Sequence, residues 1–508
     1  MTILSSKEAK IVDCLAIEKF NVIGINLMEN AGEAIAKRAA CISEGGLIGI
    51  ICGKGNNGGD GFACAVKLRK MGLNCELFLT ASVDLLSDDS KHFYSLCLEL
   101  GIPMKHSLNA KDANLNHLDI IIDGLLGIGI TGEVRDQYRR WIELINNSGA
   151  KTISIDIPSG INATSGDVCG LAVNADRTVT MGFLKQGLVI QPGKSLAGEV
   201  EIADLGYPKE VYNGLADNKN FIDESLIDDC IQSPKINIYK QKQGKLLLLA
   251  GSRGFTGAAI LAGNAAMRSG AGLVLSIIPE SINGTLEKCL IEPITFPVED
   301  YGKGFLDENA ISSISEKLDW CDAVLMGPGL GTNPAVLKIV KFVINEATKP
   351  VLIDADALTH ISNCQKDLKK TNTQLILTPH YGEASRIFNI DLKQIRKDPF
   401  SFIRNGADES GCIVVLKGSP TIIASKEETV VNTTGHQGLA TAGSGDVLSG
   451  IMGSFLCQGF PTESAAKLAV CIHGKCADTL LHEKGYRGLI ASDLISKVPS
   501  VLAGYELK

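Results

Sequence analysis

The sequence is poor in aromatic residues, in long apolar runs and in closely spaced cysteines. Aromatic side chains make up 5% of its 508 residues, and no apolar run reaches the about 18 residues that a transmembrane helix needs, so we expect no membrane span. The 15 cysteines include no C-x-x-C pair, which favours buried reduced thiols over zinc sites or disulfides. The first ten residues are not followed by the apolar segment of a signal peptide. We therefore expect a cytoplasmic protein.

A clustered positive charge is missing as well. The formal net charge is −8, whereas a general nucleic-acid binder needs a concentrated basic surface, so we expect no nucleic-acid partner. Glycine is abundant, with 54 residues, and 45% of the chain is hydrophobic. This composition is typical of α/β layers, in which small residues let helices pack closely on a sheet. The length predicts two or three domains, at about 100–200 residues each.

Short apolar runs alternate with helical patterns along the chain, as in parallel α/β sheets. In the first half we expect strands at residues 47–52, 77–79, 120–123 and 152–155. In the second half we expect strands at residues 245–250, 273–278, 323–326, 351–354, 374–378 and 412–416. Residues 206–240 are polar and weakly periodic, which is typical of a domain junction. The predicted fold class is α/β, with two doubly wound domains that bind ligands at the carboxyl ends of their strands.

A glycine-rich segment, Gly53-Lys-Gly-Asn-Asn-Gly-Gly-Asp-Gly61, follows the first strand and precedes a helix that we expect from about Phe62 to Met71. Its glycines satisfy G-x-G-x-x-G, and the amides at the start of a helix attract phosphate. A dinucleotide-dependent dehydrogenase would also need an acidic residue at the end of the next strand. Glu76 instead precedes the apolar run 77–79. The segment therefore indicates an anion cradle of another kind.

Three further polar clusters lie on or after the expected elements of the first half. They are Asn26–Gly32 on a helix, Asp123–Gly132 after one strand and Asp156–Gly160 after the next. Taken singly, Asp123 and Asp156 could be helix caps or turn residues. Together with the glycine-rich segment they would meet in one crevice, at the point where the strand order of a doubly wound sheet reverses.

These motifs resemble those of the NAD(P)H-hydrate epimerase family, which has a Rossmann-like fold, over residues 1–211. The resemblance rests on Met28-Glu-Asn-Ala-Gly32, Asn56-Asn-Gly-Gly-Asp60, Asp123 and Asp156-Ile-Pro-Ser159. It implies potassium ligands at Asn57, Asp123 and Ser159, whose oxygen atoms suit a hard cation. Proton transfer is expected from Asp123 or Asp156. The substrate contacts that it implies are Asn56, Asn57, Gly58, Gly59, Asp60, Gly127, Ile128, Gly129, Ile130, Thr131, Gly132, Glu133 and Asp156.

The segment Gln186-Gly-Leu-Val-Ile-Gln-Pro-Gly-Lys-Ser195 has some features of a phosphate-binding P-loop. Five residues separate Gly187 from Gly193 where that motif has four, and Pro192 stiffens the loop. We expect a surface turn here.

The second half carries five glycine- or aspartate-rich motifs in order. They are Gly251–Ala259, Gly327–Gly331, Asp354–Leu358, Leu377–Glu383 and Gly438–Val447. In the last of them, amides at the start of a helix would neutralise a phosphoryl group in transfer, and Asp446 would accept the proton of the attacked hydroxyl. Packing glycines with Asp446 as a helix cap are the alternative, but this would leave the other four motifs unexplained.

Residues 221–508 resemble the ribokinase-like superfamily and, within it, the ADP- or ATP-dependent NAD(P)H-hydrate dehydratases. Thr378-Pro-His-Tyr-Gly-Glu383 and Asp354-Ala-Asp-Ala-Leu358 carry this resemblance. It implies that a nucleotide, with Mg²⁺, phosphorylates the ring hydroxyl and that loss of phosphate restores the double bond. The implied substrate contacts are Ala258, Gly329, His380 and Asp446. The implied nucleotide contacts are Lys417, Gly418, Ser419, Pro420, Thr421 and Gly445.

Together the resemblances imply a bifunctional enzyme that repairs hydrated NADH and NADPH. Residues 1–220 would form an epimerase domain, an isomerase, and residues 221–508 a dehydratase domain, a lyase; we also expect a homo-oligomer. Two alternatives stay open. A thiazole or hydroxymethylpyrimidine kinase with a regulatory first domain would not need Asn57, Asp123 and Asp156. A non-enzymatic binding protein would not need titratable residues in both halves.

Overall fold

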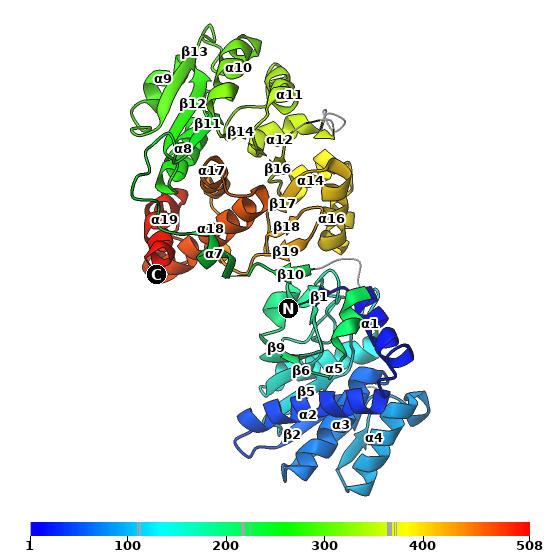
Figure 1. The fold of residues 1–508 in the computed structure, drawn as a ribbon. Coiled ribbons are helices and arrows are strands. Elements are labelled where there is room, and N and C mark those ends of the chain that lie inside the picture. The colour runs from blue at the N-terminus through cyan, green and yellow to red at the C-terminus, as the bar shows by residue number, and fades with distance from the viewer. Residues whose placement is uncertain are drawn as a thin grey trace. The chain divides into compact units, whose positions relative to one another are not determined.

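The structure is a computed structural model that describes residues 2–108, 110, 113–214, 219–223, 225–362, 368, 369, 371 and 373–507. The chain divides into two compact units, Met1–Lys219 and Asn220–Lys508 (Figure 1). In each unit a mainly parallel sheet lies between helices. The predicted α/β class with two doubly wound sheets is confirmed.

The first unit contains a seven-stranded sheet in the order β4-β3-β2-β5-β6-β7-β9, and every neighbouring pair is parallel. The strand order reverses between β2 and β5, so the crevice expected for a ligand lies at their carboxyl ends. The strands are β2 (Ile48–Cys52), β3 (Cys75–Leu79), β4 (Met104–His106), β5 (Ile120–Gly124), β6 (Lys151–Ile155), β7 (Arg177–Met181) and β9 (Glu199–Ala203). A separate short pair joins β1 (Ile3–Leu4) to β8 (Leu184–Lys185).

Helices cover both faces of this sheet. One core packs α2, α3 and α4 against it, and a second core packs α5 on the opposite face through the fully buried Trp141. The helices are α1 (Ser6–Glu18), α2 (Gly24–Ile42), α3 (Asn56–Lys70), α4 (Asp88–Glu99), α5 (Asp136–Asn147) and the short α6 (Gly193–Leu196). Single-turn 3₁₀ segments lie at η1 (Val83–Leu85), η2 (Gln186–Leu188) and η3 (Lys209–Gly214).

One sequence prediction for this unit is wrong, and a second is confirmed only in part. Helix α3 begins at Asn56, six residues before the expected start, so the polar end of the glycine-rich segment forms its first turn. This early start requires glycine at position 58, because a Cβ there would lie only 2.0 Å from the carbonyl oxygen of Gly53 and would clash with it. The expected surface turn is present at Gln191 and Pro192, which are exposed, but residues 187–190 of the same segment are buried. Apolar side chains there carry the chain into the core before it turns.

The second unit holds the main part of a ten-stranded sheet, in the order β10-β19-β18-β17-β16-β15-β14-β11-β12-β13. Strands β11 to β17 pair in parallel, and β18 and β19 continue the sheet antiparallel. The strand order reverses between β11 and β14. The strands are β10 (Lys219–Phe221), β11 (Lys245–Leu249), β12 (Leu273–Pro279), β13 (Ile294–Val298), β14 (Ala323–Met326), β15 (Val351–Ile353), β16 (Leu375–Leu377), β17 (Ile413–Leu416), β18 (Ile422–Ala424) and β19 (Thr429–Val431).

Two cores sandwich this sheet as well. Helices α8, α17, α18 and α19 belong to one core, and α10, α11 and α12 belong to the other. The helices are α7 (Ser225–Cys230), α8 (Thr256–Arg268), α9 (Glu280–Leu286), α10 (Ile311–Trp320), α11 (Val336–Glu346), α12 (Ala355–Ile361), α14 (Tyr381–Phe388), α15 (Leu392–Lys397), α16 (Pro399–Ser410), α17 (Ser444–Cys457), α18 (Thr462–Lys484) and α19 (Ala491–Glu506). Short 3₁₀ segments lie at η4 (Glu308–Ala310) and η5 (Gln437–Leu439).

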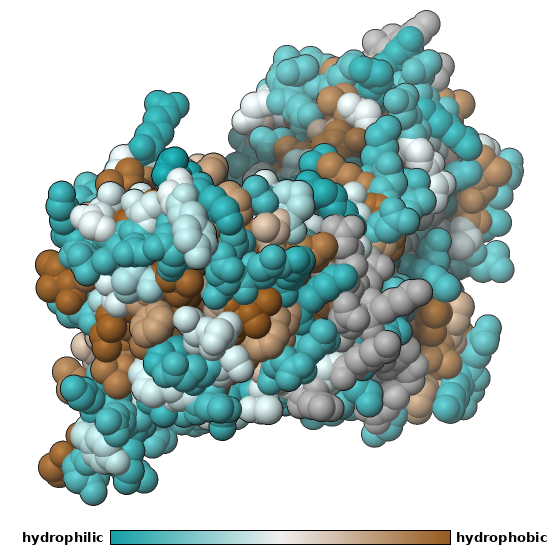
Figure 2. Space-filling model, turned by 90° about the horizontal axis from the view of Figure 1, so that it is seen from above, coloured by the Kyte–Doolittle hydropathy of each residue, from teal (hydrophilic) through white to brown (hydrophobic). Residues whose placement is uncertain are grey.

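The surface residues and the cysteines are consistent with apolar side chains being buried on both faces of the two sheets. Within the described ranges, none of the helices has the length and apolar character needed to cross a membrane. Figure 2 shows one face on which hydrophobic residues are scattered among hydrophilic ones. The 14 described cysteines are all free, and nine of them are buried.

Candidate active sites

A cavity of about 690 Å³ opens at the carboxyl ends of the first unit's strands. It collects residues from α1, α3, the segments after β5 and β6, and the segments around β8 and after β9. The predicted substrate contacts that line it are Asn56, Asn57, Asp60, Gly127, Ile128, Gly129, Ile130, Thr131, Glu133 and Asp156. The predicted residues that do not line it are Gly58, Gly59, Gly132, Asp123 and Ser159.

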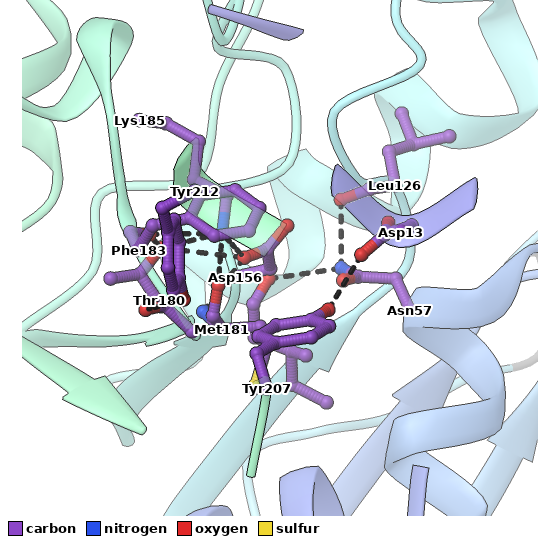
Figure 3. Close-up of polar contacts among 12 residues, drawn as sticks. Asp13, Asn57, Leu126, Asp156, Thr180, Met181, Phe183, Lys185, Tyr207 and Tyr212 are labelled. Atoms are coloured by element: carbon purple, nitrogen blue, oxygen red, sulfur yellow. Dashed lines mark hydrogen bonds and ion pairs between the residues drawn. The ribbon is translucent and has the colours of Figure 1, made fainter. Parts of the chain in front are cut away.

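Asn57, Asp123 and Ser159 belong to a hydrogen-bonded layer that is linked through Leu126 and meets the cavity at Asn57. The Asn57 amide nitrogen donates to the carbonyl oxygens of Leu126 and Ile155, both at 3.0 Å (Figure 3). The Ser159 hydroxyl donates to Asp123 Oδ1 at 2.6 Å, and its backbone N–H donates to Oδ2 at 2.9 Å. The three residues predicted as potassium ligands are therefore close neighbours, although they lie up to 102 positions apart in the sequence.

The chemistry of this layer fits a cation such as potassium. Asp123 is fully buried, and burial raises the pKa of its carboxyl group although four hydrogen bonds favour the ionised form. Its donors among the described residues are all uncharged, namely the Ser154 and Ser159 hydroxyls and the backbone N–H groups of Ser159 and Leu125. A buried carboxylate without a charged partner is costly. A cation held by oxygen ligands would compensate for that charge.

Asp156 faces the cavity from a strained turn and contacts a buried lysine. Its backbone adopts a φ of 66°, in the left-handed region that residues other than glycine rarely occupy. Its carboxylate accepts hydrogen bonds from the N–H of Met181 at 2.9 Å and from the ammonium group of Lys185. Lys185 is 1% exposed and also donates to Thr180 Oγ1 at 3.0 Å. The turn thus aims an ion-paired carboxylate into the cavity.

Lys185 also lines this cavity, although it belongs to none of the motifs that predict the site. It is the one charged residue in the otherwise apolar or glycine-rich run 181–190. A lone charge in a buried run needs a partner, and that signal could have singled it out. Asp60 lies nearby, where burial, followed by the charges of Asp156 and Asp13, raises its pKa well above the ordinary value.

The second unit brings Asp354, Lys417 and Asp446 together at the carboxyl ends of β15, β17 and the start of α17. The Lys417 ammonium group donates to Asp354 Oδ1 at 2.7 Å. Asp354 is 1% exposed and also accepts from the hydroxyls of Thr378 at 2.7 Å and Ser449 at 2.5 Å. Burial opposes ionisation of Asp354, but the charge of Lys417 and these donors outweigh it and lower its pKa. A fixed ion pair therefore lies next to the predicted base.

Asp446 stands in the first turn of α17, which follows Gly443 at a φ of 84°. Burial and then the negative charge of Asp354 raise its pKa to about 7, against the opposing charge of Lys417. A carboxyl group that titrates near neutral pH is well matched to general-base work. The N-cap position of α17 is Gly443, and no side chain caps this helix in the described structure, so Asp446 does not act as its cap.

The other residues predicted for this site lie on the same edge of the sheet. Gly329 lies close to Ala258, as shown by the 3.0 Å that would separate a Cβ on the glycine from the alanine Cβ. A Cβ on Gly445 would lie 3.7 Å from the Lys417 Nζ atom. The backbones of His380 and Lys417 pair in an isolated parallel β-bridge. His380 also caps α14 through its Nδ1. The remaining predicted nucleotide contacts, which follow Lys417 in the loop to β18, are Gly418, Ser419, Pro420 and Thr421.

No group of three or more His, Cys, Asp or Glu residues that could hold a metal comes together in the described part of the chain. The predicted potassium ligands contain one such residue, Asp123, so they would not form a group of this kind.

Comparison with known proteins matches each unit to a protein family. Residues 24–187 match the family model of the YjeF-related protein N-terminus, and residues 246–500 match the model described as NAD(P)H-hydrate dehydratase. The chain is 32% identical to the bifunctional NAD(P)H-hydrate repair enzyme Nnr of Moorella thermoacetica, over 100% of this chain and 97% of that protein. It is 34% identical to the protein of the same name from Dictyoglomus turgidum, over 98% of each.

Among solved structures, a ribokinase-like superfamily protein from Enterococcus faecalis is similar with a TM-score of 0.50 at 24% identity. It covers 57% of this chain and 97% of its own, and this likeness bears on the fold alone. The near full-length similarity to the repair enzymes includes both units. The chain therefore belongs to the family of bifunctional NAD(P)H-hydrate repair enzymes.

Proposed function

We propose that this protein repairs hydrated NADH and NADPH. The first unit interconverts the two epimers of the hydrate, and the second unit dehydrates the S epimer with ADP or ATP as the phosphoryl donor. The observation that carries this proposal is that each sheet presents its own aspartate–lysine pair at its ligand-binding edge, Asp156 with Lys185 and Asp354 with Lys417. Family membership supplies the substrate class.

The accessory groups belong to the same proposal. Asn57, Asp123 and Ser159 would hold potassium, whose charge would balance the buried Asp123. Mg²⁺ would accompany the nucleotide, with its usual role of neutralising phosphate charge. Lys417 and the loop from Gly418 to Thr421 would bind that nucleotide. A cytoplasmic location and a homo-oligomeric state complete the proposal.

In the first unit, the substrate's nicotinamide ring would enter the cavity beside Asp156. The hydrate carries its hydroxyl on a ring carbon next to nitrogen, so inverting that carbon requires protons to reach and leave the hydroxyl oxygen. Lys185 pairs with the Asp156 carboxylate and fixes its orientation, so that it can accept a proton. The start of α3 at Asn56 adds a positive helix end that suits the phosphates of the dinucleotide.

In the second unit, Asp446 would accept the proton of the ring hydroxyl as its oxygen attacks the terminal phosphorus of the nucleotide. The amides at the start of α17 and the Lys417 ammonium group would stabilise the charge on the transferring phosphoryl group. Phosphate then leaves with the electron pair of its C–O bond. Loss of a proton from the neighbouring ring carbon restores the double bond, so atoms and charge balance.

The direct test incubates the protein with chemically hydrated NADH, with and without ADP, and follows recovery of the nicotinamide absorbance. Complete recovery from a mixture of epimers requires both activities. With ADP, we expect recovery of the whole mixture. Recovery limited to the S epimer would contradict the epimerase assignment, and no recovery with either ADP or ATP would contradict the dehydratase assignment.

The dehydration rate should rise with pH through about 7, the pKa to which burial and Asp354 raise Asp446. Only the ionised carboxylate can accept the hydroxyl proton, and a raised pKa means that this form prevails above neutrality. The measurement is kcat/KM for the S hydrate across neutral pH at saturating nucleotide. A profile without a step near pH 7 would contradict proton transfer to Asp446.

The two activities should separate when residues 1–219 and 220–508 are produced as individual chains. Each unit has its own sheet and its own buried cores, so each should fold alone. We expect epimerisation from the first fragment and dehydration from the second. Two folded fragments that are active only when mixed would show that each reaction needs both units.

A further inference from the structure

A tyrosine–aspartate pair lines the first unit's cavity together with Asp156. The Tyr207 hydroxyl donates a hydrogen bond of 2.5 Å to Asp13 Oδ1, and both side chains border the cavity. Asp13 comes from α1 and Tyr207 follows β9, so tertiary structure alone joins residues 194 positions apart. Figure 3 shows the pair and Asn57 on one side of Asp156, with Lys185 on the other.

The Tyr207 ring is held in place. It stacks on Phe183 with a centroid distance of 6.1 Å and an interplanar angle of 28°. Gly182, at a φ of 68°, gives the ring room, because a Cβ there would lie 2.4 Å from Tyr207 Cε2. Ring and hydroxyl therefore have a defined position at the cavity wall, as a proton-transferring group requires.

Asp13 and Asp156, two of the four aspartates that line this cavity with Asp60 and Asp89, have different surroundings. Asp156 is paired with the Lys185 ammonium group. The Asp13 carboxyl group accepts its hydrogen bond from the uncharged Tyr207, and burial raises the pKa of Asp13. Burial and the neighbouring Asp13 charge likewise raise the pKa of the Tyr207 hydroxyl. One carboxyl group that is paired with an ammonium group and another that contacts only a neutral hydroxyl are suited to base and acid roles.

Epimerisation of the hydrate needs both a proton donor and a proton acceptor, which one carboxylate does not provide by itself. For inversion, a hydroxyl must leave the ring carbon from one face and water must arrive at the other. The leaving oxygen takes up a proton and the arriving water gives one up, so a donor and an acceptor must act within one turnover.

We propose that Tyr207 and Asp13 form a second proton-transferring pair of the epimerase and act on the ring hydroxyl together with Asp156. The inference rests on the epimerase function proposed above. With substrate bound, the Tyr207 hydroxyl turns to donate to the ring hydroxyl and accepts a hydrogen bond from the protonated Asp13, so Tyr207 passes its proton to the substrate and takes one from Asp13. The C–O bond breaks, water leaves, and the lone pair of the ring nitrogen forms a C=N⁺ bond. Water then adds to the other face, and its proton goes to the Asp156 carboxylate. Exchange with solvent restores both carboxyl groups.

The test replaces Tyr207 by phenylalanine and Asp13 by asparagine in the full-length chain. Tyr207→Phe removes the hydroxyl but keeps the stacked ring, so we expect kcat for epimerisation to fall by about 10²-fold, with KM nearly unchanged. Asp13→Asn should have a similar effect, and the double variant should be no worse than either, because the two residues act as one unit. The assay starts from a single epimer without nucleotide and follows the other by chromatography, with the spontaneous rate subtracted.

Tyr212→Phe is the matched control, because Tyr212 lies five positions away and does not line the cavity. It should epimerise like the wild type, and all variants should dehydrate the S hydrate normally, while thermal unfolding of the first unit at the wild-type temperature shows that this unit is folded. Wild-type kcat in folded Tyr207→Phe, or a change in KM alone, would overturn the inference, because a merely structural pair affects binding or stability. A wild-type protein that dehydrates but does not epimerise would instead overturn the proposed epimerase function.

Discussion

Replacing Asp446 by asparagine is expected to lower dehydration turnover by about 10²–10⁴-fold, the usual contribution of a general base. Asparagine keeps the size of the side chain but cannot accept the hydroxyl proton. Nucleotide affinity should change little, since Lys417 and the start of α17 are untouched. The variant should be at least as stable as the wild type, because burial disfavours the aspartate charge and raises its pKa to about 7.

Single-turnover dehydration, nucleotide binding and thermal unfolding should be measured on the same preparation of Asp446→Asn. Asp319→Asn, on the exposed surface of α10, is the control for the substitution itself. A folded Asp446→Asn protein that binds nucleotide and dehydrates at the wild-type rate would leave Asp446 only a structural role. If epimerisation fell together with dehydration, the assignment of separate sites would be wrong.

Replacing Asp156 by asparagine is expected to lower epimerisation by a similar factor, about 10²–10⁴-fold, while the S hydrate is still dehydrated at the wild-type rate. The uncharged amide cannot take a proton from the substrate. It also leaves the Lys185 ammonium group, 1% exposed, without its charged partner. An unpaired buried charge costs about 3–5 kcal/mol, so thermal unfolding of the first unit should occur at a lower temperature.

A second variant separates chemistry from stability. Asp156→Asn combined with Lys185→Met removes the unpaired ammonium group, so it should regain much of the lost stability. It should remain inactive in epimerisation, because no carboxylate has been restored. If epimerisation returned together with stability, Asp156 would serve only to neutralise Lys185, and the acceptor of the proton would have to be sought elsewhere in the cavity.

Much of the architecture could be read from local patterns. The apolar runs that predict β2, β5, β6, β11, β14 and β17 are recovered within one residue of their observed ends. Fully buried parallel strands can be predicted in this way because both of their faces must be apolar, which gives a continuous apolar run in the sequence. Edge strands such as β4 (Met104–His106) and β9 (Glu199–Ala203) escaped prediction because half-exposed strands lack a continuous apolar run.

Part of the first site was also accessible from sequence. Asn57, Asp123, Asp156 and Ser159 could be singled out because each follows or begins an element at the carboxyl edge of the sheet, where parallel topology brings strand ends together. Their roles as ligands or bases remain predictions. The start of α3 was misplaced by six residues, because asparagine and glycine usually signal a loop and only packing against Gly53 shows that a helix fits there.

The sequence by itself thus determined the fold class and the residues at the strand ends, because both follow from short-range periodicity and from turn chemistry. Only the tertiary structure decided which distant side chains complete the sites. Lys185 and Tyr207 carry no motif, and Asp13 lies on an ordinary amphipathic helix. They reach the cavity because α1, β8 and the segment after β9 pack at one edge of the sheet. The free energy of that packing comes from many apolar contacts spread along the chain, and no local pattern encodes it.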